Sequence, residues 1–214
     1  IAPERLESGR FIELVGQLHI PMIAVDEAHC VSQWGHDFRP SYMGIARLLQ
    51  HIKPRPVVAA FTATATDKVK QDIVKHLKMN DPLRITTGYA RDNLSFSVVK
   101  GADKRAYVAG YLRSKQGESG IIYASTRKEV EDCHRYLLKL GIQAGRYHAG
   151  LSDEERERSQ ELFLYDELKV MVATNAFGMG IDKSNVRFVI HYNLPKNLES
   201  YYQEAGRAGR DGLP

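Results

Sequence analysis

Short runs of β-branched and apolar residues alternate with helical patterns along most of this chain. The runs expected to form strands are Met22–Val25, Val57–Phe61, Phe96–Val99, Ile121–Tyr123, Lys169–Ala173 and Val186–His191. Strands that alternate with amphipathic helices are typical of parallel sheets, because each parallel connection has to cross back over the sheet. The alternation therefore predicts an α/β fold built on parallel sheets.

Residue types that begin helices stand at several of the connections. We expect a helix after Thr66, where apolar residues recur every three to four positions. Thr126 with Glu129, and Ser152 with Glu155, have the spacing of capping boxes, in which each side chain satisfies a backbone N–H at the helix start. These pairs predict two further helix starts in the second half of the chain.

A polar stretch, residues 80–93, separates the strand expected at 57–61 from the one expected at 96–99. It contains Pro82 and Gly88, which favour loops over regular structure. We place a domain boundary after Arg91, which predicts a first domain of residues 1–91 and a second of residues 92–214.

Composition narrows the possible classes of protein. A 214-residue chain with 43% hydrophobic residues can bury a sizeable core. Its apolar runs are far shorter than the roughly 20 residues of a membrane helix, so we expect a soluble protein that is not exported. The two cysteines, Cys30 and Cys133, form no close pair, which argues against zinc and for a reducing compartment. The net charge of +4 permits a polyanionic partner without requiring one.

Two carboxylates, Asp26 and Glu27, directly follow the strand expected at 22–25. In parallel α/β folds, ligands bind at the carboxyl ends of the strands. There, one carboxylate could hold Mg²⁺, usually through water, and the second could orient and deprotonate an attacking water molecule. A solvated acidic turn, or a helix start stabilised by its own carboxylates, is the alternative that this pair leaves open.

Two other segments carry side chains that could take part in a phosphate site. Thr62 and Thr64 come after the strand expected at 57–61, where they could sense the carboxylates or simply end a β-branched strand. Arg207 and Arg210 lie in the Gly-rich run 203–212, and guanidinium groups so spaced can clamp phosphate oxygens. An arginine finger, which stabilises the charge of the transition state, typically raises the rate of phosphoryl transfer about 10³–10⁵-fold. Such a run can equally be a solvated loop or a patch that binds polyanions.

Taken together, these segments resemble a known family. Asp26–His29, Phe61–Thr66, Val172–Lys183 and Gln203–Gly212 resemble, in this order, motifs II, III, V and VI of superfamily-two helicases. Residues 28–40 (AHCVSQWGHDFRP) resemble the aromatic-rich loop that distinguishes the RecQ helicases, residues 2–6 resemble motif Ib, residues 122–127 motif IV, and residues 147–151 the start of a DNA-contacting loop. The resemblance covers essentially the whole chain. It implies two RecA-like parallel-sheet lobes of a P-loop NTPase helicase core, with the first lobe incomplete and the second truncated at its end.

The resemblance also implies roles in a nucleotide site. Asp26 would help to hold Mg²⁺, Glu27 would activate water, and His29 would couple the site to Gln203. Arg210 would be the arginine finger, with Arg207 beside it. The other implied nucleotide-site residues are Thr62, Thr64, Gly180 and Asp182, of which Asp182 would touch the sugar.

A second group of residues would contact DNA. The residues implied to report DNA binding to the ATP site are Gln33, Trp34, His36, Phe38 and Arg39. Aromatic rings stack on unpaired bases at about 1–3 kcal/mol each, whereas core packing is the alternative for Trp34 and Phe38. The residues implied to contact the DNA backbone are Ser125, Arg127, His148, Thr174 and Asn175. A cap or an ordinary surface residue is the alternative for the first three, and an ordinary Gly-rich turn is the alternative for the last two.

One expected motif is missing from these 214 residues. The phosphate-binding pattern Gly-x-x-x-x-Gly-Lys-[Ser/Thr] occurs nowhere in them, so we expect this chain by itself not to hydrolyse ATP efficiently.

For the parent protein, the resemblance implies a 3′-to-5′ DNA helicase of repair and recombination. It would use ATP and Mg²⁺ and act on single-stranded and partly duplex DNA, with no zinc in this chain and no membrane partner. An RNA helicase of the same superfamily and a non-catalytic fragment that binds single strands are the alternatives. We expect a cytoplasmic protein associated with the nucleoid in a bacterium, or a nuclear one in a eukaryote.

Overall fold

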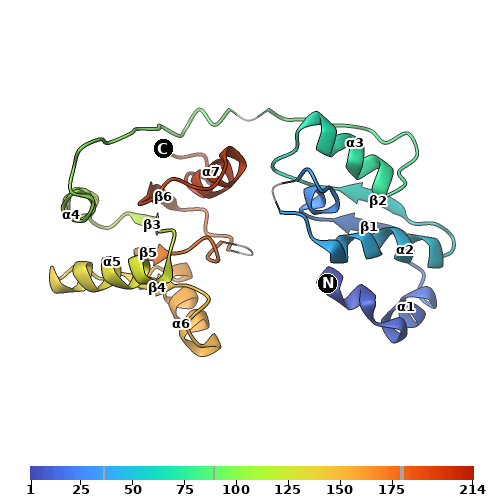
Figure 1. Ribbon diagram of the computed structural model, residues 1–214, viewed down its shortest axis with the longest axis horizontal. Coiled ribbons are helices and arrows are strands. Elements are labelled where there is room, and N and C mark those ends of the chain that lie inside the picture. Colours follow the sequence, from blue (N-terminus) through green and yellow to red (C-terminus); the bar gives the residue numbers. More distant parts are fainter. Residues whose placement is uncertain (36, 89, 179–180) are drawn as a thin grey trace. The chain divides into compact units, whose positions relative to one another are not determined.

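The computed structural model describes residues 1–35, 37–88, 90–178 and 181–214, in two compact units (Figure 1). The first unit is Ile1–Gly88 and the second is Tyr89–Pro214. The division falls three residues before the expected boundary after Arg91. Arg91 belongs to the second unit, because its guanidinium donates hydrogen bonds to the carbonyls of Ala208 and Gly209 there, at 3.1 and 2.7 Å. His36 and Gly180, named above as site residues, lie outside the described residues.

The first unit is built on a two-stranded parallel sheet. Its elements are η1 (Pro3–Glu7), α1 (Gly9–Gly16), β1 (Met22–Val25), η2 (Ala28–Val31), η3 (Pro40–Tyr42), α2 (Met43–His51), β2 (Val57–Ala60) and α3 (Asp67–His76), the η elements being 3-10 helices. β1 and β2 pair in register from Met22 opposite Val57 to Val25 opposite Ala60. Both strands predicted in this part of the chain are therefore confirmed, with β2 one residue shorter than expected.

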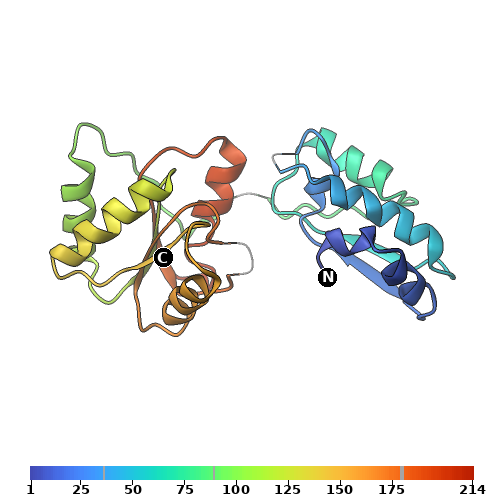
Figure 2. The same cartoon turned by 60° about the horizontal axis from the view of Figure 1, so that its bottom comes forward.

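Helix α2 joins two apolar clusters of the first unit. Its residues Ile45 and Leu49 pack with side chains of β1 and α3, and its Leu48 packs with Val15 of α1. Because two adjoining stripes of one helix are apolar, α2 can cover the sheet and hold α1 at the same time. Figure 2 shows α2 and α3 (light blue and green) lying along the strands of this unit.

The second unit is a four-stranded parallel sheet in the order β4-β5-β3-β6. Its elements are α4 (Lys104–Ser114), β3 (Ser119–Tyr123), α5 (Arg127–Lys139), β4 (Gly145–Tyr147), α6 (Asp153–Leu164), β5 (Val170–Ala173), β6 (Val186–His191) and α7 (Leu198–Ala205). The two central strands, β3 and β5, are buried along their whole length. Full burial on both faces explains why β5 (VMVA) is continuously apolar and why β3 (SGIIY) shows no polar alternation after Ser119.

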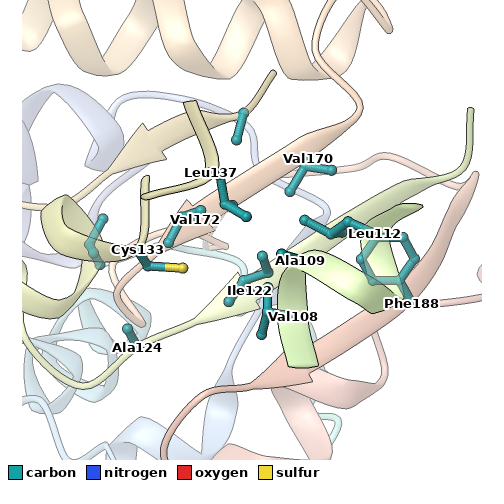
Figure 3. Close-up of a cluster of buried hydrophobic side chains, with 12 residues drawn as sticks. Val108, Ala109, Leu112, Ile122, Ala124, Cys133, Leu137, Val170, Val172 and Phe188 are labelled. Carbon is teal, nitrogen blue, oxygen red and sulfur yellow. The ribbon is translucent and has the colours of Figure 1, made fainter. Parts of the chain in front are cut away.

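Successive side chains of these central strands point to opposite faces of the sheet. Ile122 and Val172 face α4 and α5, in the cluster that Figure 3 shows around Leu112, Cys133 and Leu137. Ile121 and Met171 face the other way, toward Phe163 of α6. Because side chains alternate in this way, both faces of the sheet are apolar, and helices cover each of them, as the predicted α/β architecture requires.

The predicted helix starts are confirmed. Thr66 caps α3, with its side chain accepting a hydrogen bond from the backbone N of Val69 at 3.4 Å. Capping boxes form at Thr126 with Glu129 and at Ser152 with Glu155. Among the described residues, no helix has the length and apolar character of a membrane span.

The strand predicted at residues 96–99 is wrong. These residues form no strand and have no sheet neighbour in the described part of the chain, and the side chains of Phe96, Val98 and Val99 are exposed. A β-branched sequence favours an extended backbone, but a strand also needs a hydrogen-bonded neighbour. Conversely, β4 is a strand that the sequence pattern does not predict, because three residues including Gly145 are too few to show a period.

Candidate functional site

The carboxylates of Asp26 and Glu27 stand directly after β1, where the backbone turns sharply. Glu27 has a left-handed backbone, with φ 47° and ψ 43°, and it is the N-cap residue of the short helix η2. Asp26 Oδ1 accepts a hydrogen bond from Glu27 N at 2.8 Å. A left-handed backbone costs a residue other than Gly roughly 1–2 kcal/mol, so the surrounding structure has to hold this turn in place.

Backbone hydrogen bonds tie this turn to the end of β2. Phe61 N donates to Val25 O at 2.8 Å, and Ala28 N donates to Phe61 O at 2.8 Å. The hydroxyl of Tyr42 also donates to the carbonyl of Asp26, at 3.2 Å. The two carboxylates are thereby fixed at the carboxyl edge of the sheet, which is the usual place of ligand sites in parallel α/β folds.

His29 connects Glu27 with the predicted hydroxyl residues. The His29 side chain is 2% exposed, and its Nδ1 lies 3.0 Å from Thr62 Oγ1 and 3.3 Å from Glu27 Oε2. The Thr62 hydroxyl donates its proton to the carbonyl of Thr64 at 3.1 Å, so Thr62 Oγ1 accepts from His29. This donor order places a proton on Nδ1, between the hydroxyl and the carboxylate. The structure thus brings Glu27, His29, Thr62 and Thr64 together, and the pairing of His29 with Gln203 stays a prediction.

The donor set at this edge suits Mg²⁺ bound together with a nucleotide. The described residues contain no group of three or more His, Cys, Asp or Glu side chains that could hold a metal ion by themselves. Mg²⁺ usually takes only one or two carboxylates, with phosphate oxygens and water as its other ligands. The exposed Asp26 is suited to that role.

The aromatic segment, defined here as residues 32–35 and 37–39, folds back against His29. Gly35 N donates to Ser32 O at 3.0 Å, and a Cβ at Gly35 would overlap with the carbonyl oxygen of His29. Trp34 is 67% exposed, which excludes core packing for its ring. Gln33 is also exposed and Phe38 is half-buried, while Arg39 pairs with Asp37 at 2.8 Å.

In the second unit, the two predicted phosphate-binding arginines have different surroundings. Arg207 is buried, and its Nη1 donates to the carbonyl of Gly178 at 2.6 Å. Arg210 is more exposed and pairs with Asp182 at 3.2 Å. Exposed ion pairs are worth about 0–1 kcal/mol, so Arg210 can exchange Asp182 for a phosphate at little cost. Arg207, in contrast, holds the loop at Gly178 in place.

The predicted DNA-backbone residues gather at one edge of the second sheet. Ser125, His148 and Thr174 follow the neighbouring strands β3, β4 and β5, while Asn175 is exposed beside Thr174 and Arg127 begins α5. Ser125 N donates to Asn193 Oδ1 at 3.1 Å, and Thr174 N donates to Tyr147 O at 3.1 Å. The parallel topology therefore brings together residues from three separate motifs.

His148 faces the interior of its own unit. Its Nε2 lies 2.8 Å from Glu131 Oε1, and its Nδ1 accepts from Gly150 N at 3.1 Å. Burial opposes ionisation of Glu131, but the hydrogen bonds from His148 and Arg146 outweigh it and lower the pKa of that carboxyl. In this arrangement, the exposed residues of the segment are Ala149 and Gly150, and the contact of His148 with DNA stays a prediction.

Sequence reasoning missed one half-buried pair at this site. His191 Nε2, at the end of β6, lies 2.9 Å from Glu204 Oε2 on α7, and the His191 ring stacks on Tyr123. Glu204 lies in the last turn of α7, three residues before Arg207, so this pair fixes the end of α7 against the sheet. The repeated Arg and Gly residues dominate the pattern at 203–212, and no spacing in the sequence relates Glu204 to His191.

Two family models match the chain. The model for the helicase conserved C-terminal domain matches residues 103–212, and the model for DEAD/DEAH box helicases matches residues 2–73. The chain is 54% identical over 213 residues to "ATP-dependent DNA helicase RecQ" of Bacillus subtilis, a match that covers 100% of this chain and 36% of the relative. It is 44% identical over 221 residues to "RecQ-like DNA helicase BLM" of Xenopus laevis, a match that covers 99% of this chain and 16% of the relative. The chain spans about a third of the length of the bacterial relatives it matches.

Solved structures of other helicases share the fold. The Mycobacterium smegmatis helicase Lhr, bound to ssDNA and AMP-PNP, aligns with a TM-score of 0.76 at 21% identity, over 97% of this chain and 29% of that one. Dbp5 of S. cerevisiae, bound to RNA and ADP BeF3, aligns with a TM-score of 0.69 at 23% identity, over 95% of this chain and 55% of the Dbp5 chain. At these identities the likeness establishes the fold alone.

Proposed function

Because the chain belongs to the RecQ group of superfamily-two helicases, we propose that it forms part of an ATP-dependent DNA helicase. In this proposal, the parent protein couples ATP hydrolysis to 3′-to-5′ movement on single-stranded DNA and to unwinding of duplex DNA in repair and recombination. Such a motor works where the DNA is, on the bacterial nucleoid or in a eukaryotic nucleus.

The observation that carries this proposal is the cluster of Glu27, His29 and Thr62 at the carboxyl ends of β1 and β2. A carboxylate at this edge can orient an attacking water molecule and accept its proton. The buried His29, 3.3 Å from Glu27, holds that carboxylate in one orientation. Asp26 beside it would hold Mg²⁺, which neutralises charge on the phosphates when it is bound.

The remaining predicted residues divide into two tasks. Arg210 would leave Asp182 to stabilise the charge that develops on the transferred phosphate, while Arg207 keeps its backbone contact at Gly178. Trp34 would stack on unpaired bases, and the sheet edge around Thr174 would contact the DNA backbone. The phosphate-binding loop that this sequence lacks would be supplied by another part of the parent protein.

The test is ATP hydrolysis by the parent-length protein with no nucleic acid, with single-stranded DNA and with single-stranded RNA. We expect stimulation by DNA, its loss in Trp34→Ala, and loss of all hydrolysis in Glu27→Gln. Glu13→Gln, an exposed glutamate on α1, is the matched control and should behave like the wild type. Stimulation by RNA alone would replace the DNA helicase with an RNA helicase, and DNA binding without any hydrolysis would leave a binding module.

A further inference from the structure

A chain of hydrogen bonds anchors the aromatic segment to helix α3. The hydroxyl of Ser32 donates to Asp72 Oδ2 at 2.6 Å, and Ser32 Oγ in turn accepts a hydrogen bond from the backbone N of Trp34 at 3.1 Å. Ser32 is fully buried. Since a hydroxyl has one proton and two lone pairs, the carboxylate of Asp72 sets the direction of the Ser32 hydroxyl. Asp72 thereby helps to position the backbone of Trp34.

A second residue of α3 contacts the Trp34 ring itself. The ammonium of Lys68 lies over the indole, 3.2 Å from the ring centroid, where the electron-rich face of the ring attracts a cation. Lys68 and Asp72 are four residues apart on α3 and therefore share one helix face. One face of α3 thus holds both the ring and the backbone of the most exposed aromatic residue in the segment.

The same helix begins immediately after the residues that hold His29. Thr62 accepts the hydrogen bond from His29, Thr64 accepts one from Thr62, and Thr66 caps α3. The stretch from Glu27 to Trp34 is therefore linked twice to the stretch from Thr62 to Asp72. The link between His29 and Thr62 lies beside the catalytic carboxylate, and the link between Ser32 and Asp72 lies beside Trp34.

We propose that Asp72 and Lys68 are positioning residues that carry the effect of nucleic acid binding at Trp34 to the His29–Thr62 contact beside Glu27. A base that stacks on the covered face of the indole has to displace the Lys68 ammonium, so the first turn of α3 responds to occupancy of the ring. Asp72 keeps the segment joined to α3 while this happens. The proposal rests on the proposed function, because it concerns DNA-stimulated hydrolysis at this site.

The first experiment compares Asp72→Ala and Lys68→Ala with two matched controls in the parent-length protein. Asp67→Ala and Lys70→Ala remove the same residue types from the same helix, but these two residues pair with each other at 3.2 Å. We expect the DNA-stimulated rate to fall by about 3–30-fold in the first two variants, while the rate without DNA stays at the wild-type level. Both controls should keep full stimulation. Equal stimulation in all four variants would overturn the proposal.

A second readout separates positioning from a general loss of structure. Asp72→Asn keeps an oxygen that can accept from the Ser32 hydroxyl, so we expect it to recover most of the stimulation that Asp72→Ala loses. Trp34 is the single tryptophan of the 214-residue chain, so emission of this chain reports on that ring alone. Lys68→Ala should change the emission, and Lys70→Ala should not. Unchanged emission in Lys68→Ala, or no recovery in Asp72→Asn, would contradict the assignment.

The wild-type protein separates a failure of this proposal from a failure of the proposed function. If DNA does not stimulate wild-type hydrolysis, the helicase function itself is refuted, and the coupling role with it. If DNA stimulates the wild type and the Asp72 and Lys68 variants equally, only the coupling role is refuted.

Discussion

Asp166 joins the starts of three strands of the second unit, and its replacement tests how this unit is held together. Its Oδ1 accepts from Ser119 Oγ at 2.9 Å, Lys169 Nζ at 2.8 Å and Lys183 Nζ at 2.9 Å, and its Oδ2 accepts from Asn185 at 3.0 Å. Ser119 begins β3, and Lys169 and Asn185 directly precede β5 and β6. One carboxylate therefore ties together the amino ends of three neighbouring strands.

The two lysines that share Asp166 differ in burial. The Lys183 side chain is 3% exposed, whereas that of Lys169 is 41% exposed and that of Asp166 is 36% exposed. Asp166→Asn keeps the shape of the side chain, and asparagine suits the left-handed backbone at this position, φ 65°. The change leaves the Lys183 ammonium buried without its carboxylate partner. Breaking a buried pair in this way costs roughly 3–5 kcal/mol. Because Asp166 is about one-third exposed, we expect a smaller loss of unfolding free energy, about 2–3 kcal/mol.

The reverse change should cost less. In Lys183→Met, the partly exposed carboxylate keeps Ser119, Lys169 and Asn185, and the new side chain is apolar and lies beside Phe163. We expect a loss of about 1 kcal/mol. The double variant should be more stable than Asp166→Asn alone, because it no longer contains an unpaired buried ammonium.

The pH dependence has a defined direction. Hydrogen bonds from Lys169 and Lys183 hold the pKa of Asp166 well below its usual value, although burial opposes this. In the unfolded chain the pKa of this carboxyl is about 3.9. Its contribution to stability is therefore fully present above that pH and is lost as the pH falls through the lower pKa of the folded state. The difference between wild type and Asp166→Asn should shrink below about pH 4.

Hydrogen exchange followed by peptide mass analysis is the suitable assay, because it reports opening of each unit separately. Peptides from β3 and β5 should exchange faster in Asp166→Asn, and peptides from β1 and β2 serve as the internal control. Equal losses in Asp166→Asn and Lys183→Met, or a loss below about 1 kcal/mol in Asp166→Asn, would refute the assigned role of the buried ammonium.

Two further changes test single features of the fold. Thr126→Ala removes the capping box of α5 and should destabilise the second unit by about 1 kcal/mol. The loss should appear as faster hydrogen exchange in α5. The control is Lys128→Ala, a change at an exposed residue nearby, which should have little effect. Burial raises the pKa of both Cys30 and Cys133 to about 11, so neither thiol should react with iodoacetamide at pH 8 in the folded chain, while both should react in denaturant. Rapid labelling of Cys133 under native conditions would show that its cluster opens readily.

Local sequence patterns predicted those features that depend on neighbouring residues. The alternation of strand and helix patterns predicted the parallel α/β architecture, and Thr66, Thr126 and Ser152 predicted three helix starts at the correct positions. These predictions hold because helix capping and strand periodicity depend on residues a few positions apart. The helicase-like segments were recognisable in sequence for a related reason, since each is a short, continuous run of residues, and those at 26–29 and 61–66 directly follow strands.

Tertiary structure decided which distant groups meet. The sequence placed Ser32 and Asp72, His191 and Glu204, and His148 and Glu131 on separate elements, and only folding brings each pair within hydrogen-bond distance. It also decided that residues 96–99 form no strand, because pairing depends on a neighbour and not on the β-branched pattern alone. The sequence by itself thus determined the elements and the chemistry they carry. Which side chains are buried, paired or left exposed for a ligand follows from packing between elements that no local period encodes.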